Sequence, residues 1–85
     1  MAQEQQVSRI AAVTGGGSGI GAAVAMRLAQ SGHRVAVLDI QIDNAKAVAD
    51  QLNAQRPDSA MAVRIDVGDP QSVDAAFSAI EKQWG

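Results

Sequence analysis

The sequence has no cysteine, no tyrosine and a single histidine, His33. Without cysteine the chain has no disulfide and no thiolate chemistry, and one histidine does not supply a ligand set, so we expect no metal site. Aromatic residues make up only 2% of the chain, so Ala, Val, Ile and Leu must build the core. The net charge of −2, with both signs interspersed, gives no basic surface for nucleic acid.

The length of 85 residues leaves room for one small domain and excludes two. Residues 1–7 are expected to be a polar tail, because they contain no apolar run of the kind found in secretory signals or membrane segments. We therefore expect no membrane association and a cytoplasmic protein. The domain itself is expected over residues 8–85.

Short apolar runs alternate with longer segments of helical periodicity. The runs are rich in Val, Ile and Ala and have the length and composition of strands buried on both faces. The predicted order is strand 8–14, helix 21–32, strand 34–39, a helix between Asp43 and Pro57, strand 60–67, and a helix from Pro70 to Trp84. The sequence therefore predicts an α/β fold.

Each predicted helix has one apolar face. The first is expected to turn Val24 toward a sheet, with other small or apolar residues at helical spacing. We expect Asp43 to cap the second helix and Asn53 to lie on its surface. The apolar stripe of the third helix includes Phe77 and Trp84, which are predicted to be core residues rather than base-stacking groups.

The short connections favour parallel strands joined by right-handed crossovers. This topology is the first half of a Rossmann-type doubly wound sheet with strand order 3-2-1, in which the first two helices share one face and the third returns across the other. A returning helix implies a fourth strand beside the first, and this sequence has none. We therefore expect the strand at 8–14 to be an apolar edge, and the chain to be truncated before a second half.

A glycine-rich loop, 14–21, joins the first predicted strand to the first predicted helix, with the sequence Thr-Gly-Gly-Gly-Ser-Gly-Ile-Gly. Such a loop presents free backbone N–H groups at the positive end of a helix dipole, and glycines let a pyrophosphate approach closely. The spacing of Gly15, Gly19 and Gly21 is G-x-x-x-G-x-G, so the G-x-G-x-x-G fingerprint is not matched, and no lysine follows as in a P-loop. The alternative is a merely flexible turn.

The loop resembles the T-G-x-x-x-G-I-G signature of short-chain dehydrogenases/reductases, and the resemblance extends to the helix closing on Trp84. It implies that Gly15 makes the turn, that Ser18, Gly19 and Ile20 lie along the phosphates and the adjoining ribose, and that Gly21 permits close helix packing. The expected cofactor-binding residues of the loop are Gly15, Gly17, Ser18, Gly19 and Ile20.

Asp39 ends the second predicted strand, at about the separation from the loop expected of an acid that accepts hydrogen bonds from the adenosine ribose. This position favours NAD over NADP, because a 2′-phosphate there meets a like charge. NADP users of the family often carry Arg or Lys where this chain has Ser18 and Ile40. The alternative is that Asp39 is an ordinary turn residue.

Asp66 and Val67 end the third predicted strand, on the same edge of the sheet as the loop. The family resemblance implies that this pair contacts the adenine. Asp66 could instead cap the next helix, but Asp69, directly before Pro70, is the better cap. The expected cofactor-binding set therefore also includes Asp39, Ile40, Asp66 and Val67.

The family carries out hydride transfer with a Tyr-x-x-x-Lys pair and a Ser, and this chain contains no Tyr. We therefore expect no catalytic residue here and no activity of the chain alone. The resemblance implies a parent oxidoreductase that moves hydride between NAD and a secondary alcohol or ketone, and that forms homo-oligomers. The alternative is a stand-alone nucleotide-binding module without catalysis.

Overall fold

The computed structural model describes residues 9–85, and the expected polar tail lies outside them. The elements are β1 (Ile10–Thr14), α1 (Gly19–Gln30), β2 (Arg34–Asp39), α2 (Ile42–Gln55), β3 (Ala60–Arg64) and α3 (Pro70–Trp84). The predicted alternation of strands and helices is confirmed. The third strand ends three residues before its predicted bound, because its neighbour β2 ends at Asp39, which pairs with Arg64.

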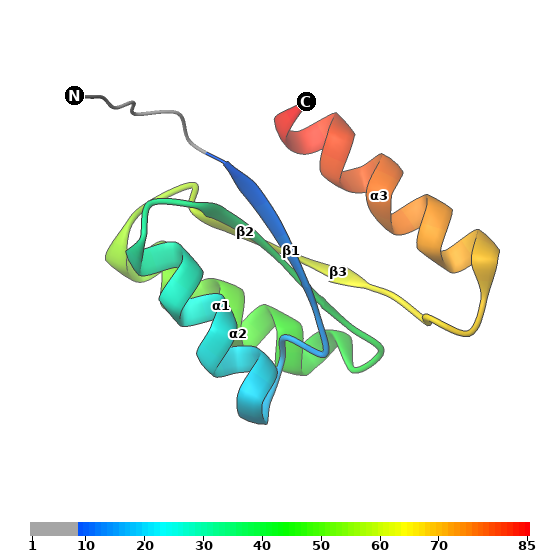
Figure 1. The fold of residues 1–85 in the computed structure, drawn as a ribbon, viewed down its shortest axis with the longest axis horizontal. Coiled ribbons are helices and arrows are strands. Elements are labelled where there is room, and N and C mark those ends of the chain that lie inside the picture. Colours follow the sequence, from blue (N-terminus) through cyan, green and yellow to red (C-terminus); the bar gives the residue numbers. More distant parts are fainter. Residues whose placement is uncertain (1–8) are drawn as a thin grey trace.

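The strands form one parallel sheet of order β1-β2-β3, which is the predicted order 3-2-1 read from the opposite edge. Figure 1 shows α1 and α2 together on one side of the sheet and α3 on the other. This arrangement confirms the predicted doubly wound topology. Because the strands are parallel, the carboxyl ends of β1, β2 and β3 all lie at the same edge of the sheet.

The core consists of two layers that share the central strand. Val35 and Val37 of β2 pack with the buried faces of α1 and α2, whereas Ala36 and Leu38 pack with Ile65 and α3. All four of these β2 residues are fully buried. The alternation follows from the period of two along a strand, and β2, the central strand, is fully buried on both faces at residues 35–38.

The prediction that β1 is buried on both faces is wrong. Ala11 and Val13 are half-buried, whereas Ile10, Ala12 and Thr14 are exposed. Ala12 pairs with Ala36 and therefore lies on the α3 side of the sheet. Among residues 9–85, α3 packs over β2 and β3, and no element covers this side of β1.

Two residues assigned to apolar helix faces are also more exposed than predicted. Val24 is 43% exposed and Phe77 is 48% exposed, although Trp84 packs partly buried against the α3 layer as expected. Helical periodicity identifies which residues share a face, and a three-stranded sheet is too narrow to cover the full width of these faces.

The helix starts follow different rules. The Asp69 side chain accepts a hydrogen bond from the Gln71 N–H at 3.0 Å and Pro70 opens α3, as predicted. The prediction that Asp43 caps α2 is wrong, since Gln41 is the N-cap residue and Asp43 lies in the first turn. The helix begins earlier because the Asp39 carboxylate accepts the Gln41 N–H at 2.9 Å and holds the preceding turn.

The connection between α2 and β3 depends on Asn53, which was expected on the surface and is half-buried. Its Oδ1 accepts the N–H groups of Ser59 and Ala60, each at 2.9 Å, and its Nδ2 donates to the Ala60 carbonyl at 3.0 Å. Ser59 is 1% exposed and donates its hydroxyl to the Leu52 carbonyl. One side-chain amide thus pairs three backbone groups where the chain enters β3.

Replacing Asn53 with alanine is expected to lower the free energy of unfolding by about 2 kcal/mol, because buried backbone donors lose their acceptor. Gln51→Ala, an exposed amide of the same helix, is the matched control and should change stability by less than about 0.5 kcal/mol. Urea unfolding of both variants gives the comparison. Equal stabilities of the two variants would contradict this structural role of Asn53.

Candidate cofactor site

The glycine loop between β1 and α1 is held in a tight backbone path. Gly15 and Gly19 have φ of 67° and 57°, in the left-handed region that favours glycine. The Gly16 N–H donates to the Leu38 carbonyl at 3.1 Å, which ties the loop to the end of β2. The loop therefore lies against the carboxyl edge of the sheet.

Three other glycines of the loop, Gly16, Gly17 and Gly21, are required by close approach rather than by φ. A Cβ on Gly21 would lie 2.0 Å from the Gly15 carbonyl oxygen, so the first turn of α1 packs directly on the loop. The resemblance implied close helix packing at Gly21, and the structure shows that the packing partner is the Gly15 turn and not the sheet. A Cβ on Gly17 would lie 2.8 Å from the Ala45 backbone nitrogen and from the Asp39 Oδ2.

The start of α1 can receive an anion. Ser18 is the N-cap residue, and within residues 9–85 neither its side chain nor an acidic residue in the first turn satisfies the N–H groups there. The Ala22 N–H, bonded to the Ser18 carbonyl at 3.2 Å, is the first to enter the helical pattern. The free N–H groups before it and the helix dipole both favour a phosphate. Ile20 is 85% exposed beside them.

Asp39 lies at the end of β2 and is 9% exposed. Its Oδ2 accepts the Gly17 N–H at 3.0 Å, and its Oδ1 accepts the Gln41 N–H at 2.9 Å. The carboxylate thus already serves two backbone donors, and each oxygen retains a lone pair for a ligand hydroxyl. The Gly17 N–H points at Asp39, so Gly17 is not a free phosphate donor in this geometry.

A cavity of about 220 Å³ opens beside the loop, lined by Gly15, Asp39, Ile40, Ile65, Asp66 and Val67. The structure therefore brings five of the predicted site residues into one cavity, while Gly17, Ser18, Gly19 and Ile20 continue the loop next to it. Ile65, the sixth lining residue, was not predicted. The available signal was its place directly before Asp66.

Asp66 holds the far wall of this cavity through its backbone and side chain. Its N–H donates to the Ser72 hydroxyl at 2.8 Å, and its Oδ1 accepts the Gly68 N–H at 3.0 Å. Asp66 does not cap α3, which agrees with the assignment of that role to Asp69. Val67 is 71% exposed and Ile40 is 50% exposed, so both offer apolar surface to a flat ring.

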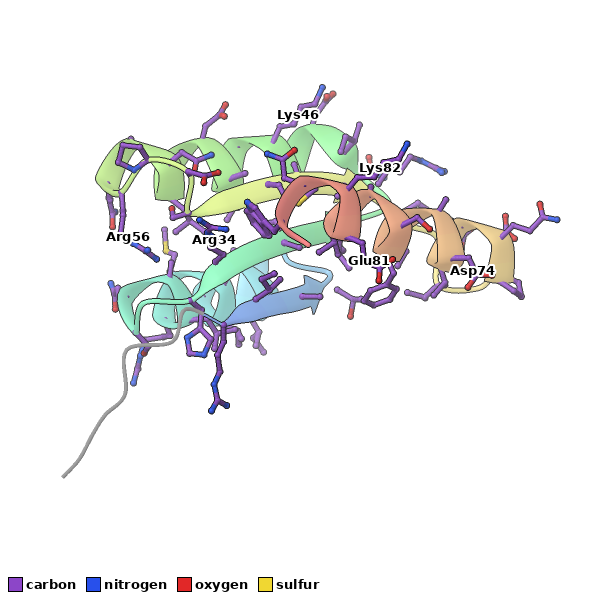
Figure 2. All side chains as sticks on the ribbon, turned by 90° about the horizontal axis from the view of Figure 1, so that it is seen from above. Arg34, Lys46, Arg56, Asp74, Glu81 and Lys82 are labelled. Atoms are coloured by element: carbon purple, nitrogen blue, oxygen red, sulfur yellow. The ribbon has the colours of Figure 1, made fainter. Side chains whose placement is uncertain are left out.

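The side chains for hydride-transfer catalysis are not gathered at this cavity. The chain has no Tyr, and its lysines, Lys46 and Lys82, are exposed on α2 and α3 (Figure 2). Within the described part of the chain, no three His, Asp or Glu side chains meet as a metal site would require. The loop, the uncapped helix start and the cavity together form a site that an anionic nucleotide fits.

The family model for short chain dehydrogenases matches residues 9–85. The chain belongs to this family. D-threitol dehydrogenase of Mycolicibacterium smegmatis is 40% identical over 77 residues, a match covering 91% of this chain and 29% of the relative. The 3-oxoacyl-[acyl-carrier-protein] reductase MabA of Mycobacterium tuberculosis is 40% identical over 79 residues, with 93% and 27% covered. The chain thus spans less than a third of the length of these relatives.

Solved structures of the short-chain dehydrogenase family share the fold. A 3-ketoacyl-(acyl-carrier-protein) reductase from Brucella melitensis complexed with NADH superposes with a TM-score of 0.86 at 33% identity, covering 95% of this chain and 32% of that one. A family member from Burkholderia phymatum in complex with NAD gives 0.87 at 28% identity, covering 98% and 29%. None of the helices in residues 9–85 has the length and apolar character to cross a membrane.

Proposed function

We propose that this chain binds NAD as the cofactor half of an oxidoreductase. The observation that carries the proposal is the buried Asp39 carboxylate at the wall of a cavity that is also lined by Gly15, in the loop that leads into the uncapped start of α1. When bound, NAD supplies the nicotinamide that accepts or donates a hydride. The chain's own residues bind and orient it.

The proposed roles follow the order of groups along the cofactor. The N–H groups of Gly19 and Ile20 face the pyrophosphate, where the helix dipole favours negative charge. Asp39 accepts the adenosine ribose hydroxyls. Asp66 and Val67 border the adenine, and Ile40 lines the same cavity. The solved relatives in complex with NADH and with NAD support this assignment.

The proposed preference for NAD rests on charge. A ribose hydroxyl donates to the Asp39 carboxylate, and such a bond to a charged group contributes about 1.5–3 kcal/mol. A 2′-phosphate has no proton to donate and meets a like charge at a buried position. Ser18 and Ile40, at the positions where family members that use NADP often carry a cation, offer no compensation.

The full-length protein is expected to bind NAD at least about tenfold more tightly than NADP, corresponding to about 1.4 kcal/mol. Asp39→Ala should narrow this ratio, because it removes the hydroxyl acceptor and the repulsion together. Arg64, the exposed register partner of Asp39 on β3, keeps its positive charge in this variant. Calorimetric titration with both dinucleotides measures the ratio.

Asp43→Ala is the matched control, since Asp43 is an exposed acid in the first turn of α2 and does not line the cavity. It removes the same charge and should leave the ratio of NAD to NADP affinity unchanged. Equal affinities of the unmodified protein for NAD and NADP would contradict the proposed role of Asp39 as acceptor for the adenosine ribose hydroxyls.

The proposed reaction is hydride transfer between NAD and a secondary alcohol or ketone, carried out by a full-length, cytoplasmic homo-oligomer. The relatives' names, a threitol dehydrogenase and a 3-oxoacyl reductase, support this substrate class. The Tyr, Lys and Ser of the family's catalytic set are expected outside these 85 residues. The chain alone is therefore expected to bind cofactor without turning it over.

A further inference from the structure

The Asp39 carboxylate joins two segments that are far apart in the sequence. Its Oδ2 accepts the N–H of Gly17 in the loop, and its Oδ1 accepts the N–H of Gln41 directly before α2. Gly17 fits so closely that a Cβ there would meet Asp39 Oδ2, Asn44 Cβ and the Ala45 nitrogen, each at 2.8 Å. One buried side chain thus connects the loop to the start of α2.

The loop needs such a connection. Residues 15–17 are three successive glycines, which lose more conformational freedom on ordering than any other residue type. Besides the packing of α1 on Gly15, two hydrogen bonds hold them, from the Gly16 N–H to the Leu38 carbonyl and from the Gly17 N–H to Asp39. If the loop is already ordered before the ligand binds, the conformational entropy cost of ordering it does not reduce the binding free energy.

We propose that Asp39 is a positioning residue for the pyrophosphate, through Gly17, as well as the acceptor for the ribose. This inference rests on the proposed NAD site and extends it. Asp39 then strengthens binding of a part of the cofactor that it does not touch. Its removal weakens phosphate binding even when the ligand has no ribose hydroxyls.

The sign of the effect separates this role from simple electrostatics. A carboxylate close to a pyrophosphate repels it, so charge alone predicts that removing Asp39 tightens binding of an anion that lacks hydroxyls. Loss of the loop contact predicts weaker binding of the same ligand. Asparagine is an informative replacement because it has one carbonyl oxygen for the two backbone N–H groups.

The test uses the full-length protein and two probes, ADP and 2′,3′-dideoxy-ADP, titrated calorimetrically into the native protein, Asp39→Asn and Gly17→Ala. We expect Asp39→Asn to bind dideoxy-ADP at least about threefold more weakly, the effect of one lost hydrogen bond. Gly17→Ala breaks the same bond from the other side while retaining the carboxylate. It should weaken both probes at least as much.

Amide hydrogen exchange without ligand provides a readout independent of binding. In Asp39→Asn, exchange should become faster in the loop at residues 15–17 and stay unchanged in β2 at Val35 and Val37, which also shows that the variant is folded. Dideoxy-ADP binding that is unchanged or tighter, or loop exchange that is unchanged, overturns the positioning role and leaves the ribose role intact. Failure of the native protein to bind either probe overturns the NAD site itself, and this inference with it.

Discussion

Gly21→Ala is expected to lower the free energy of unfolding by about 3 kcal/mol, at the upper end of overpacking effects. The new Cβ would lie 2.0 Å from the carbonyl oxygen and 2.7 Å from the carbonyl carbon of Gly15. Both atoms belong to backbone, so no side chain can rotate away, and the first turn of α1 must move off the loop. Because that turn carries the N–H groups proposed to face the pyrophosphate, NAD affinity should fall about 100-fold, equivalent to about 2.7 kcal/mol.

The direction of the change makes this result informative. Gly21 lies inside α1, where alanine is intrinsically favoured over glycine by about 1 kcal/mol, so helix propensity alone predicts a more stable protein. Gly19→Ala is the comparison within the same loop, since a Cβ there meets nothing within 4 Å and the residue bears only the strain of φ 57°. That strain costs about 1–2 kcal/mol.

Urea unfolding and calorimetric titration of the full-length protein give both quantities for each variant. Gly21→Ala should be clearly worse than Gly19→Ala in stability and in NAD affinity. A Gly21→Ala protein as stable as the native one, with unchanged affinity for NAD, would show that the helix start does not pack on the Gly15 turn.

The topology could be predicted from the sequence because its signals are local. Each strand is a short run rich in branched and small apolar residues, and in each helix the apolar residues recur every three to four positions. Gly32, with φ of 95°, follows the end of α1 as expected. Short connections and the right-handed crossover rule then leave few arrangements. The loop signature identified the cofactor edge for the same reason, since its glycines are contiguous.

The extent of burial could not be predicted in this way. Periodicity groups Val73, Ala76, Phe77 and Ile80 on one stripe, and the structure buries Ala76 and Ile80 while Phe77 remains 48% exposed. Burial depends on what lies opposite a residue, which is a non-local property. The same reason explains β1, whose apolar composition indicated two covered faces although residues 9–85 cover only one of them.

The internal bonds of the site were missed for a related reason. The motif predicts that Gly17 belongs to the loop and that Asp39 ends a strand, but the bond between them joins residues 22 positions apart. Likewise, nothing in a helical pattern distinguishes Asn53, which bonds to Ser59 and Ala60, from an exposed amide such as Gln51. A polar side chain has several possible hydrogen-bond partners, and the fold determines which one it meets. The sequence pattern alone does not identify that partner.

The 85-residue chain by itself is expected to self-associate through β1. Within the described residues, β1 pairs on one side only, with β2, so its other side presents unpaired N–H and C=O groups. Ile10 is 42% exposed, and Ala12 is exposed on the α3 side of the sheet, where α3 packs over β2 and β3 and leaves β1 uncovered. An unprotected, apolar edge strand of this kind templates pairing with another chain.

Ala12→Lys should suppress this association, because a lysine on an edge strand adds charge and hydration where a second strand would pair. Gln51→Lys adds the same charge on the exposed surface of α2 and should leave the association unchanged, so net charge is controlled. Sedimentation velocity over a range of concentrations measures the change, with the expected loss of large species confined to Ala12→Lys. The unmodified chain could instead be a monodisperse monomer with a cooperative thermal transition. That result would mean that the two core layers are enough to stabilise the fold, and that the open side of β1 does not drive association.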